Sequence, residues 1–128
     1  MPKRKPKKKT LENKCDALWR EIIKRNGSCD WCGKSSGKLD AHHVMGRGRK
    51  SLRWDLRNGV ALCFRCHRLK AHSPSAKDVQ EYLDWVKEYK ADDWEYLMYK
   101  ANIEFPETVG IIKLQEYLSI LEVEDGQD

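Results

Sequence analysis

The sequence has no long apolar run, which excludes one broad class of protein. No segment carries the roughly 18 apolar residues that a membrane-spanning helix needs. The charged N-terminus, MPKRKPKKK, is not followed by the apolar stretch of a secretory signal. The chain is therefore predicted to be soluble and cytoplasmic, without a membrane partner.

Apolar residues are also scarce in the composition as a whole. They make up 40% of the 128 residues, which is a low share for a globular chain of this length. The length allows one domain with a modest core and is too short for two independent domains. A core of this size would gain stability from a structural metal ion.

The five cysteines could supply such a metal site. Cys29 and Cys32 form one C-x2-C pair, and Cys63 and Cys66 form another. In a reducing cytoplasm, an odd number of cysteines arranged as two such pairs favours metal-bound thiolates over disulfides. Four thiolates at these spacings predict a closed, structural zinc site, and the alternative is four unligated thiols. Cys15 lies on an apolar helical stripe and is predicted to be a buried free thiol.

The charged residues are divided unevenly along the chain. Residues 1–72 hold 20 Lys and Arg against 6 Asp and Glu, whereas residues 73–128 hold 5 against 14. The basic part suits a polyanion, because each phosphate that it neutralises releases counterions. Residues 1–9 are predicted to be a disordered basic arm that holds nucleic acid without reading it, and a solubilising tail or an import signal is the alternative.

The first half of the chain has the pattern of a helix followed by a strand. A helix is expected from a cap at Thr10 to a left-handed residue at Gly27, with its apolar residues on one face. The C-x2-C turn follows, and a short strand is expected to end near His43. The segment after this strand is rich in Gly, Arg and Lys and is predicted to be a loop.

The rest of the chain is predicted to be mostly helical. A turn at Asn58-Gly59 leads to a second strand and to a short helix that begins near Cys63. Three more helices are expected: one capped by Ser75 with Asp78, one around Trp94 to Ala101, and one between Pro106 and a loose tail from Glu122. Residues 10–72 would form the zinc-bound core with its N-terminal helix, and residues 73–128 an acidic helical extension of the same domain.

Three histidines lie close to the cysteine pairs in the sequence. His42 and His43 end the first predicted strand, and His67 follows Cys66 directly. A zinc ion bound by the four cysteines would bring these two segments together. Two of the imidazoles could then bind a second divalent ion that keeps open coordination positions for water and substrate. The third could accept a proton from the attacking water. The alternative is that these histidines are hydrogen-bonded structural residues near the zinc.

These motifs resemble those of a known family. The segments DAHHV and LRNGVALCFRCH and the enclosing C-x2-C pairs are similar to the HNH endonucleases, especially small phage-encoded recombination nucleases of the NinG-like type and the phage junction-resolving endonuclease VII. The resemblance covers Cys29 to His72. It implies an α+β fold, in which a small zinc-stapled ββα-metal (His-Me finger) core is flanked by α-helices.

The resemblance also implies roles for single residues. His43 matches the general base that activates water for attack on a phosphodiester, and His42 and His67 match the two metal ligands. Asn58 matches the asparagine that ties the loop after the first strand to the hairpin and helps to orient the base. The products would carry 5′-phosphate and 3′-hydroxyl ends, as they do in the family.

The ligand set departs from the family pattern. His42 stands where the family usually has Asp, so Mn²⁺, Ni²⁺ or Zn²⁺ is plausible beside Mg²⁺ as the catalytic ion. Asp40 lies on the same side of an ideal strand as His42, and it is either a further ligand or a carboxylate that orients the His42 ring. His72 comes five residues after His67, whereas colicin-type nucleases place a further ligand four residues after. His72 is therefore predicted to be a phosphate contact or a surface residue.

Cations cluster around the predicted site and are candidates for DNA binding through the phosphate backbone. They are Arg47, Arg49, Lys50, Arg53, Arg57, Arg65, Arg68 and Lys70. Such contacts position a duplex without reading bases, so low sequence specificity is expected. An alternative for Arg53 and Arg57 is that they pair with Asp55 or with the acidic half of the chain.

The sequence thus predicts a metal-dependent DNA endonuclease or nickase, of low sequence specificity or directed to branched DNA in phage recombination or packaging. One alternative is a DNA-binding module that is stabilised by the zinc site and has no catalytic activity. Another is an adaptor whose acidic helices dock a partner. A homodimer or a phage protein bound through the C-terminal helices is a candidate assembly.

Overall fold

A computed structural model describes residues 7–46, 48–102 and 109–126 of the chain. Most of the predicted basic arm, Arg47 and Pro106 lie outside these described residues. Within them, no helix combines the length and the apolar character that are needed to cross a membrane.

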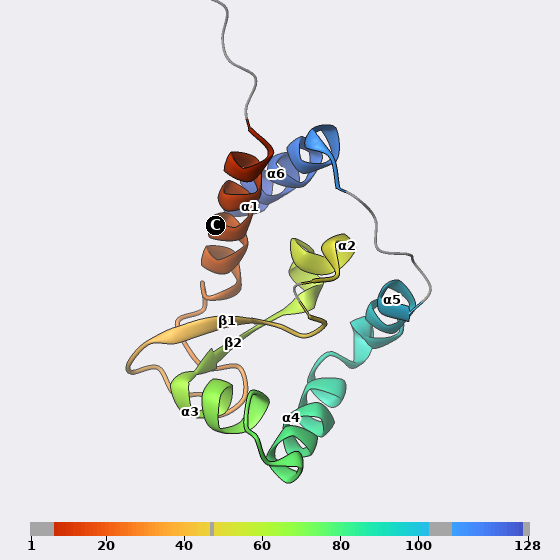
Figure 1. Ribbon diagram of the computed structural model, residues 1–128. Coiled ribbons are helices and arrows are strands. Elements are labelled where there is room, and N and C mark those ends of the chain that lie inside the picture. The colour runs from red at the N-terminus through yellow and green to blue at the C-terminus, as the bar shows by residue number, and fades with distance from the viewer. Residues whose placement is uncertain (1–6, 47, 103–108, 127–128) are drawn as a thin grey trace, which may run out of the picture.

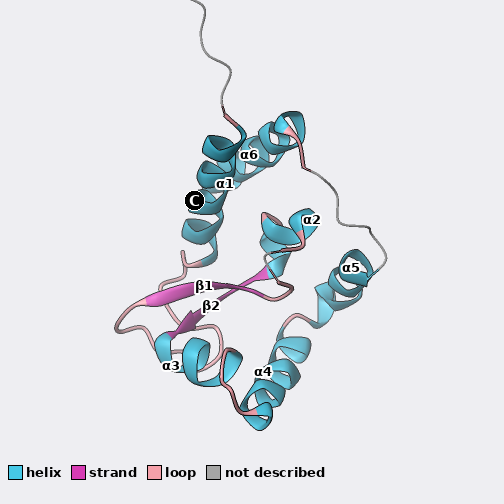
Figure 2. Cartoon of the chain, in the orientation of Figure 1, coloured by secondary structure: helices cyan, strands magenta, loops and turns pink. Residues whose placement is uncertain are grey.

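The described residues form six α-helices and one small sheet, and the α+β class is confirmed (Figures 1 and 2). The elements in chain order are α1 (Lys8–Ile23), β1 (Leu39–His43), α2 (Lys50–Arg53), the 3-10 helix η1 (Leu56–Asn58), β2 (Gly59–Cys63), α3 (Phe64–Cys66), the π-helical turn η2 (His67–Ala71), α4 (Ala76–Tyr89), α5 (Ala91–Asn102) and α6 (Ile111–Asp125). The predicted order of strand, strand and short helix is therefore present between residues 39 and 71.

The two strands pair antiparallel, and the register places His42 opposite Val60 and His43 opposite Gly59. Successive side chains of a strand point to opposite faces of the sheet, so these adjacent histidines face opposite sides. Figure 1 shows α1 on one side of the sheet and α3 and α4 on the other. The two imidazoles of the HH pair therefore have different surroundings.

A separate apolar cluster lies on each face of the sheet. On one face, Cys15 and Trp19 of α1 pack with Leu114 and Leu121 of α6. On the other, the apolar residues of β2 and the cysteines pack against Tyr82 and Val86 of α4. Burial raises the pKa of the Cys15 thiol to about 11, and its Sγ lies 3.7 Å from the carbonyl oxygen of Leu114, to which it donates. The prediction of a buried free thiol is confirmed.

Helix α1 begins three residues earlier than a cap at Thr10 predicts. Its first residue is Lys8, the preceding Lys7 makes no side-chain capping bond, and Thr10 lies inside the helix. The helix ends at Ile23, and Gly27 has the expected positive φ of 73°. The apolar stripe predicted this helix, but the cap signal placed its start wrongly, because a threonine can also occupy the first turn of a helix.

The boundaries of the C-terminal helices also differ from expectation. Ser75 precedes α4 but makes no side-chain capping bond, since the Asp78 carboxylate accepts bonds from Ser73 and Lys70 instead. Helix α6 continues to Asp125, through most of the segment predicted to be a loose tail. Its end is held by Arg25, which pairs with Asp125.

Gly59 allows α1 to approach the sheet closely. A Cβ atom at this position would lie 2.5 Å from Cδ1 of Ile23 and 2.7 Å from Cζ2 of Trp19. A rigid indole cannot move away from such a contact as a flexible chain end can. The glycine that begins β2 is therefore what permits Trp19 to pack beside the strand that carries His43.

Candidate active site

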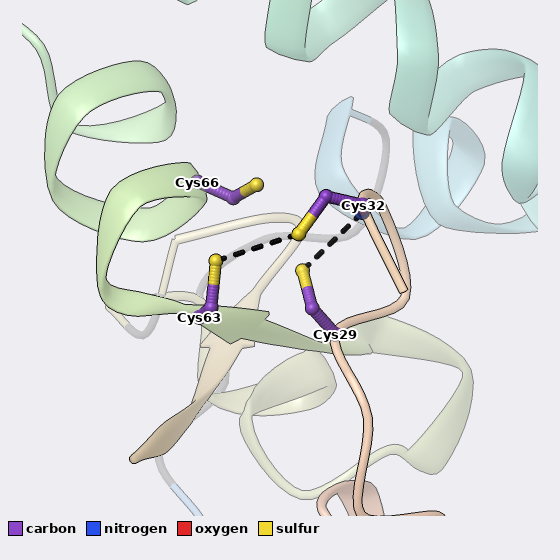
Figure 3. Close-up of side chains that lie close together, drawn as sticks. All are labelled: Cys29, Cys32, Cys63 and Cys66. Carbon is purple, nitrogen blue, oxygen red and sulfur yellow. Dashed lines mark hydrogen bonds between the residues drawn. The ribbon is translucent and has the colours of Figure 1, made fainter. Parts of the chain in front are cut away.

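The four paired cysteines come together at one end of the sheet (Figure 3). Cys29 and Cys32 come from the turn before β1, Cys63 ends β2, and Cys66 lies on α3. Their sulfurs lie within 4.8 Å of one another, and Sγ of Cys32 is 3.7 Å from Sγ of Cys63. Zinc–sulfur bonds of about 2.3 Å in a tetrahedron place the sulfurs about 3.8 Å apart. The donor set and its spacing fit a structural zinc site.

Local backbone geometry forms the turn that carries the first pair. Gly33 has φ of +80° and donates to the carbonyl of Cys29 over 2.9 Å. Asp30 ties the turn to β2, because its carboxylate accepts a 2.8 Å bond from the amide of Ala61 and its own amide donates to the carbonyl of Ala61. The turn that carries Cys29 and Cys32 is thus held against the strand that carries Cys63.

The electrostatics of Cys63 favour a metal-bound thiolate. Burial acts to raise the pKa of its thiol, but hydrogen bonds from the Cys66 amide and from the neighbouring thiols lower it to about 7. A thiolate, and not a thiol, is the form that ligates zinc.

A second cluster of metal-ligating side chains consists of His42, His67 and His72. Their ligand atoms lie within 4.8 Å of one another. The ring centroids are separated by 5.1 Å for His42 and His67, 4.9 Å for His42 and His72, and 4.8 Å for His67 and His72. The structure therefore brings together the two predicted ligands and adds a third histidine.

His72 joins the cluster because the turn before it is π-helical. Its amide donates to the carbonyl of His67 over 2.9 Å, which is the five-residue bond of a π-turn. In a regular α-helix, residues five apart would point about 140° away from each other around the axis. The prediction that His72 is a phosphate contact or a surface residue was based on its spacing of five residues from His67, in place of the four found in colicin-type nucleases. No local sequence pattern marks the π-turn, which is why the sequence did not reveal this third histidine.

Asp40 is bonded to His67 and is not part of the histidine cluster. Its Oδ2 lies 3.0 Å from Nδ1 of His67, which donates to it. A carboxylate in this position fixes the tautomer, so that Nε2 of a neutral His67 ring carries the lone pair. The expectation that Asp40 might orient His42 names the wrong ring, because the carboxylate orients His67.

His42 is the most enclosed of the three clustered histidines. Burial, and then the neighbouring imidazoles of His67, His72 and His43, lower the pKa of His42 to about 3. The ring of Tyr82 packs edge-on against it, with centroids 5.2 Å apart. His42 is therefore a neutral imidazole at neutral pH, which is the form that binds a metal ion.

His43 lies on the other face of the sheet and does not share the histidine cluster. Its Nε2 donates to the carbonyl oxygen of Arg53 over 2.9 Å. Its ring stacks on the indole of Trp19, with centroids 3.9 Å apart and planes at 4°. With Trp19, Arg20, Ala41 and Asp16 it lines a pocket of about 150 Å³. The sequence predicted that the rings of His42, His43 and His67 converge. The structure brings His42 and His67 together, but the third ring of the cluster is His72 and not His43.

Asn58 joins the loop after β1 to the start of β2, as the resemblance implied. It is fully buried, its Oδ1 accepts a 2.7 Å bond from the amide of Met45, and its Nδ2 donates 3.0 Å bonds to the carbonyls of Met45 and Leu52. These contacts are those of a positioning residue.

Two predicted DNA-binding arginines have protein partners. Arg53 is only 8% exposed and pairs with Asp16 and Glu12 on α1, so its guanidinium does not lie on the surface where a phosphate could reach it. Arg57 pairs with Asp55 and lies over the ring of Tyr96 at 3.4 Å. The pairing of Arg57 with Asp55 is the alternative that the sequence analysis had named, whereas the partners of Arg53 lie in the basic half of the chain.

The other candidate cations differ in their surroundings. Arg49 donates to the carbonyl of Ala101, Lys50 lies 3.8 Å from Glu12, and Lys70 pairs with Asp78 and Glu81. Arg65 and Arg68 are exposed beside the cysteine and histidine clusters. Arg68 lines a pocket of about 430 Å³ with Lys38, Asp40 and Phe64. Among the predicted phosphate contacts that the structure describes, Arg65 and Arg68 are therefore the best placed.

Comparison with known proteins agrees with the geometry of this region. The family model for HNH endonuclease matches residues 29–73, which is about a third of the chain. This segment contains every residue of the cysteine cluster and of the histidine cluster. No curated protein and no solved structure matches the chain. The central part of this chain, residues 29–73, is therefore similar to the HNH endonuclease family.

Proposed function

We propose that this protein is a metal-dependent DNA endonuclease or nickase in which His43 is the general base. The observation that carries the proposal is the cluster of His42, His67 and His72 beside the cysteine cluster, with His43 next to His42 in the chain. A DNA-binding module without catalysis would need the four cysteines but would not need three imidazoles within ligand distance of one another.

The histidine cluster fits a catalytic divalent ion. His42, His67 and His72 would hold it, and a set of neutral imidazoles suits Ni²⁺ or Zn²⁺ better than Mn²⁺ or Mg²⁺, which prefer oxygen ligands. When bound, such an ion supplies positive charge that polarises the phosphoryl group and stabilises the leaving 3′-oxygen. Asp40 would hold the His67 ring in the orientation that binding needs.

His43 has the tautomer that a general base requires. A carbonyl oxygen only accepts, so Nε2 carries the hydrogen that is donated to Arg53. Nδ1 of the neutral ring then carries the lone pair. In the proposed reaction, Nδ1 takes a proton from water as the water oxygen bonds to phosphorus, and the bond from phosphorus to the 3′-oxygen breaks. An imidazole with a reference pKa of about 6.5 suits this role near neutral pH.

The proposed substrate is DNA, held through its phosphates. Arg65, Arg68 and Lys38 are exposed on the side of the sheet that carries the histidine cluster, where they can contact the backbone without reading bases. This arrangement supports low sequence specificity or recognition of a branched structure. A cytoplasmic role in phage recombination is part of the same proposal and rests on the sequence resemblance.

The proposal is tested by incubating supercoiled plasmid, linear duplex and a four-way junction with Mg²⁺, Mn²⁺, Ni²⁺ or Zn²⁺. We expect metal-dependent nicking by the wild type that EDTA abolishes. His67→Ala should bind the catalytic ion more weakly and lose most of the activity, while its content of tightly bound zinc is unchanged. DNA binding without cutting under every metal would instead support a module without catalysis.

Asp40→Asn is expected to weaken the binding of the catalytic ion without removing any of its ligands. The neutral amide oxygen can still accept from the His67 N–H but binds it more weakly than a charged carboxylate does, so we expect metal affinity to fall by about 10- to 100-fold. The measurement is the metal concentration at half-maximal cleavage, with Asp30→Asn as a control, because that residue binds the cysteine turn and not the histidine cluster. An unchanged metal requirement would show that Asp40 does not orient His67 in solution.

A further inference from the structure

We propose that helix α1 is part of the catalytic site, with Trp19 and Asp16 as positioning residues for His43. This inference rests on the proposed role of His43 as general base. Helix α1 lies outside residues 29–73, the segment that matches the family model. Among the described residues, a ring stack and a hydrogen bond reach His43 from this side of the sheet, and each constrains a different rotation of the imidazole.

The first contact is the stack on Trp19, which sets the plane of the imidazole ring. The two planes differ by only 4° at a centroid separation of 3.9 Å. Trp19 is 1% exposed, and its Nε1 donates to the carbonyl oxygen of Asp55 over 2.9 Å. The indole is therefore held by packing and by a hydrogen bond, and it presents a rigid surface to the histidine.

The second contact is the bond from Nε2 of His43 to the carbonyl of Arg53, which fixes the ring within that plane. The position of this carbonyl depends on Asp16. Nε of Arg53 donates to Oδ1 of Asp16 over 3.0 Å, and its terminal nitrogen donates to Oδ2 over 2.6 Å. Trp54 also donates to Oδ1 over 2.9 Å. Both charged partners are buried, so this bidentate pair holds α2 against α1.

Asn58 holds the backbone immediately before this carbonyl. Its Nδ2 donates to the carbonyl of Leu52, the residue before Arg53. Gly59, which pairs with His43 across the sheet, leaves the space that Trp19 occupies. The plane of the His43 ring and its rotation within that plane are thus both set by residues that are packed or hydrogen-bonded, and Nδ1 is directed by them.

Loss of the stack should reduce the rate of the chemical step and leave substrate binding intact. A misplacement of about 1 Å in a reacting group can cost about a hundredfold in rate. We therefore expect Trp19→Leu to lower kcat by about 10- to 100-fold, with KM for DNA changed by less than about twofold. Trp19→Phe keeps an aromatic face and should restore kcat to within a few fold. Asp16→Asn, which weakens the hold on Arg53, should give a similar split between kcat and KM.

The matched control is Leu121→Ala. Leu121 is buried in the same apolar cluster as Trp19 but belongs to α6, so its truncation destabilises the fold without touching His43. It should lower the melting temperature and leave kcat unchanged. If Leu121→Ala lowers kcat as much as Trp19→Leu does, the effect of Trp19 is one of general stability and the proposal is overturned.

A double-mutant comparison shows whether Trp19 acts through His43. In a His43→Ala background, Trp19→Leu should have no further effect on the residual cleavage rate. An equal loss in both backgrounds would mean that Trp19 acts independently of the base, and it would overturn the proposal.

A spectroscopic readout separates this inference from the proposed function. The Trp19 ring current should shift the carbon-bound ring protons of His43 upfield in an NMR spectrum, with the signals assigned through His43→Gln. The shift should vanish in Trp19→Leu and persist in Trp19→Phe and Leu121→Ala. If the wild type cleaves no DNA with any metal, the proposed function fails and this shift still tests the contact. Unshifted His43 signals in the wild type would show that the stack is absent in solution.

Discussion

Cys63→Ser is expected to abolish cooperative folding of residues 29–73. Cys63 ends β2, pairs with Leu39 across the sheet and supplies one of four sulfurs within 4.8 Å of one another. A serine hydroxyl does not replace a thiolate as a zinc ligand at neutral pH. In zinc-finger peptides, binding of a structural zinc contributes about 10–16 kcal/mol, so the loss of one ligand should exceed the marginal stability of a small domain. The thermal transition should disappear, together with bound zinc and the near-ultraviolet circular dichroism.

The control for this variant is Cys15→Ser, the same chemical change at a buried cysteine outside the cluster. Its hydroxyl can keep the bond to the carbonyl of Leu114, and it should cost only about 1–3 kcal/mol. Zinc content and the cooperative transition should therefore remain. A Cys63→Ser protein that melts like the wild type and retains zinc would show that the cysteine cluster does not hold the core together.

His43→Ala is expected to reduce the cleavage rate by about 10²- to 10⁴-fold, the usual contribution of a general base. Metal affinity and DNA affinity should remain near wild-type values, because His43 lies on the opposite face of the sheet from the histidine cluster. The measurement is the single-turnover cleavage rate at saturating metal, with binding of the catalytic ion determined separately.

His67→Ala provides the comparison for that variant. It removes a ligand and should lower both metal affinity and rate, whereas His43→Ala should lower the rate alone. Wild-type cleavage by His43→Ala would remove this residue from the mechanism. A loss of metal binding in His43→Ala would instead assign it to the ligand set.

Local sequence pattern predicted the parts of this protein that depend on nearby residues. The C-x2-C spacing identified the cysteine cluster, because two such pairs are a common pattern of metal-binding thiolates. Apolar periodicity located α1, α4, α5 and α6 within a few residues. Helix ends were less accurate, since α6 continues to Asp125, where it pairs with Arg25, a distant residue that the sequence of the helix does not show.

The surroundings of the histidines could not be predicted in this way. His72 reaches His42 and His67 only because a π-turn replaces an α-turn between residues 67 and 71. Arg53 had the sequence context of a surface cation, but its carboxylate partner lies 37 residues earlier in the chain. Trp19 had the spacing of an ordinary core residue, and its stack on His43 depends on how closely α1 packs at Gly59.

By itself, the sequence determined that two cysteine pairs and a histidine pair belong to one small α+β core. Those features follow from the spacing of residues along the chain and from the chemistry of thiols and imidazoles. Only the tertiary structure decided which imidazoles meet and which arginines are buried. Those outcomes depend on the packing of distant helices against two faces of a sheet, and packing is a property of the whole chain.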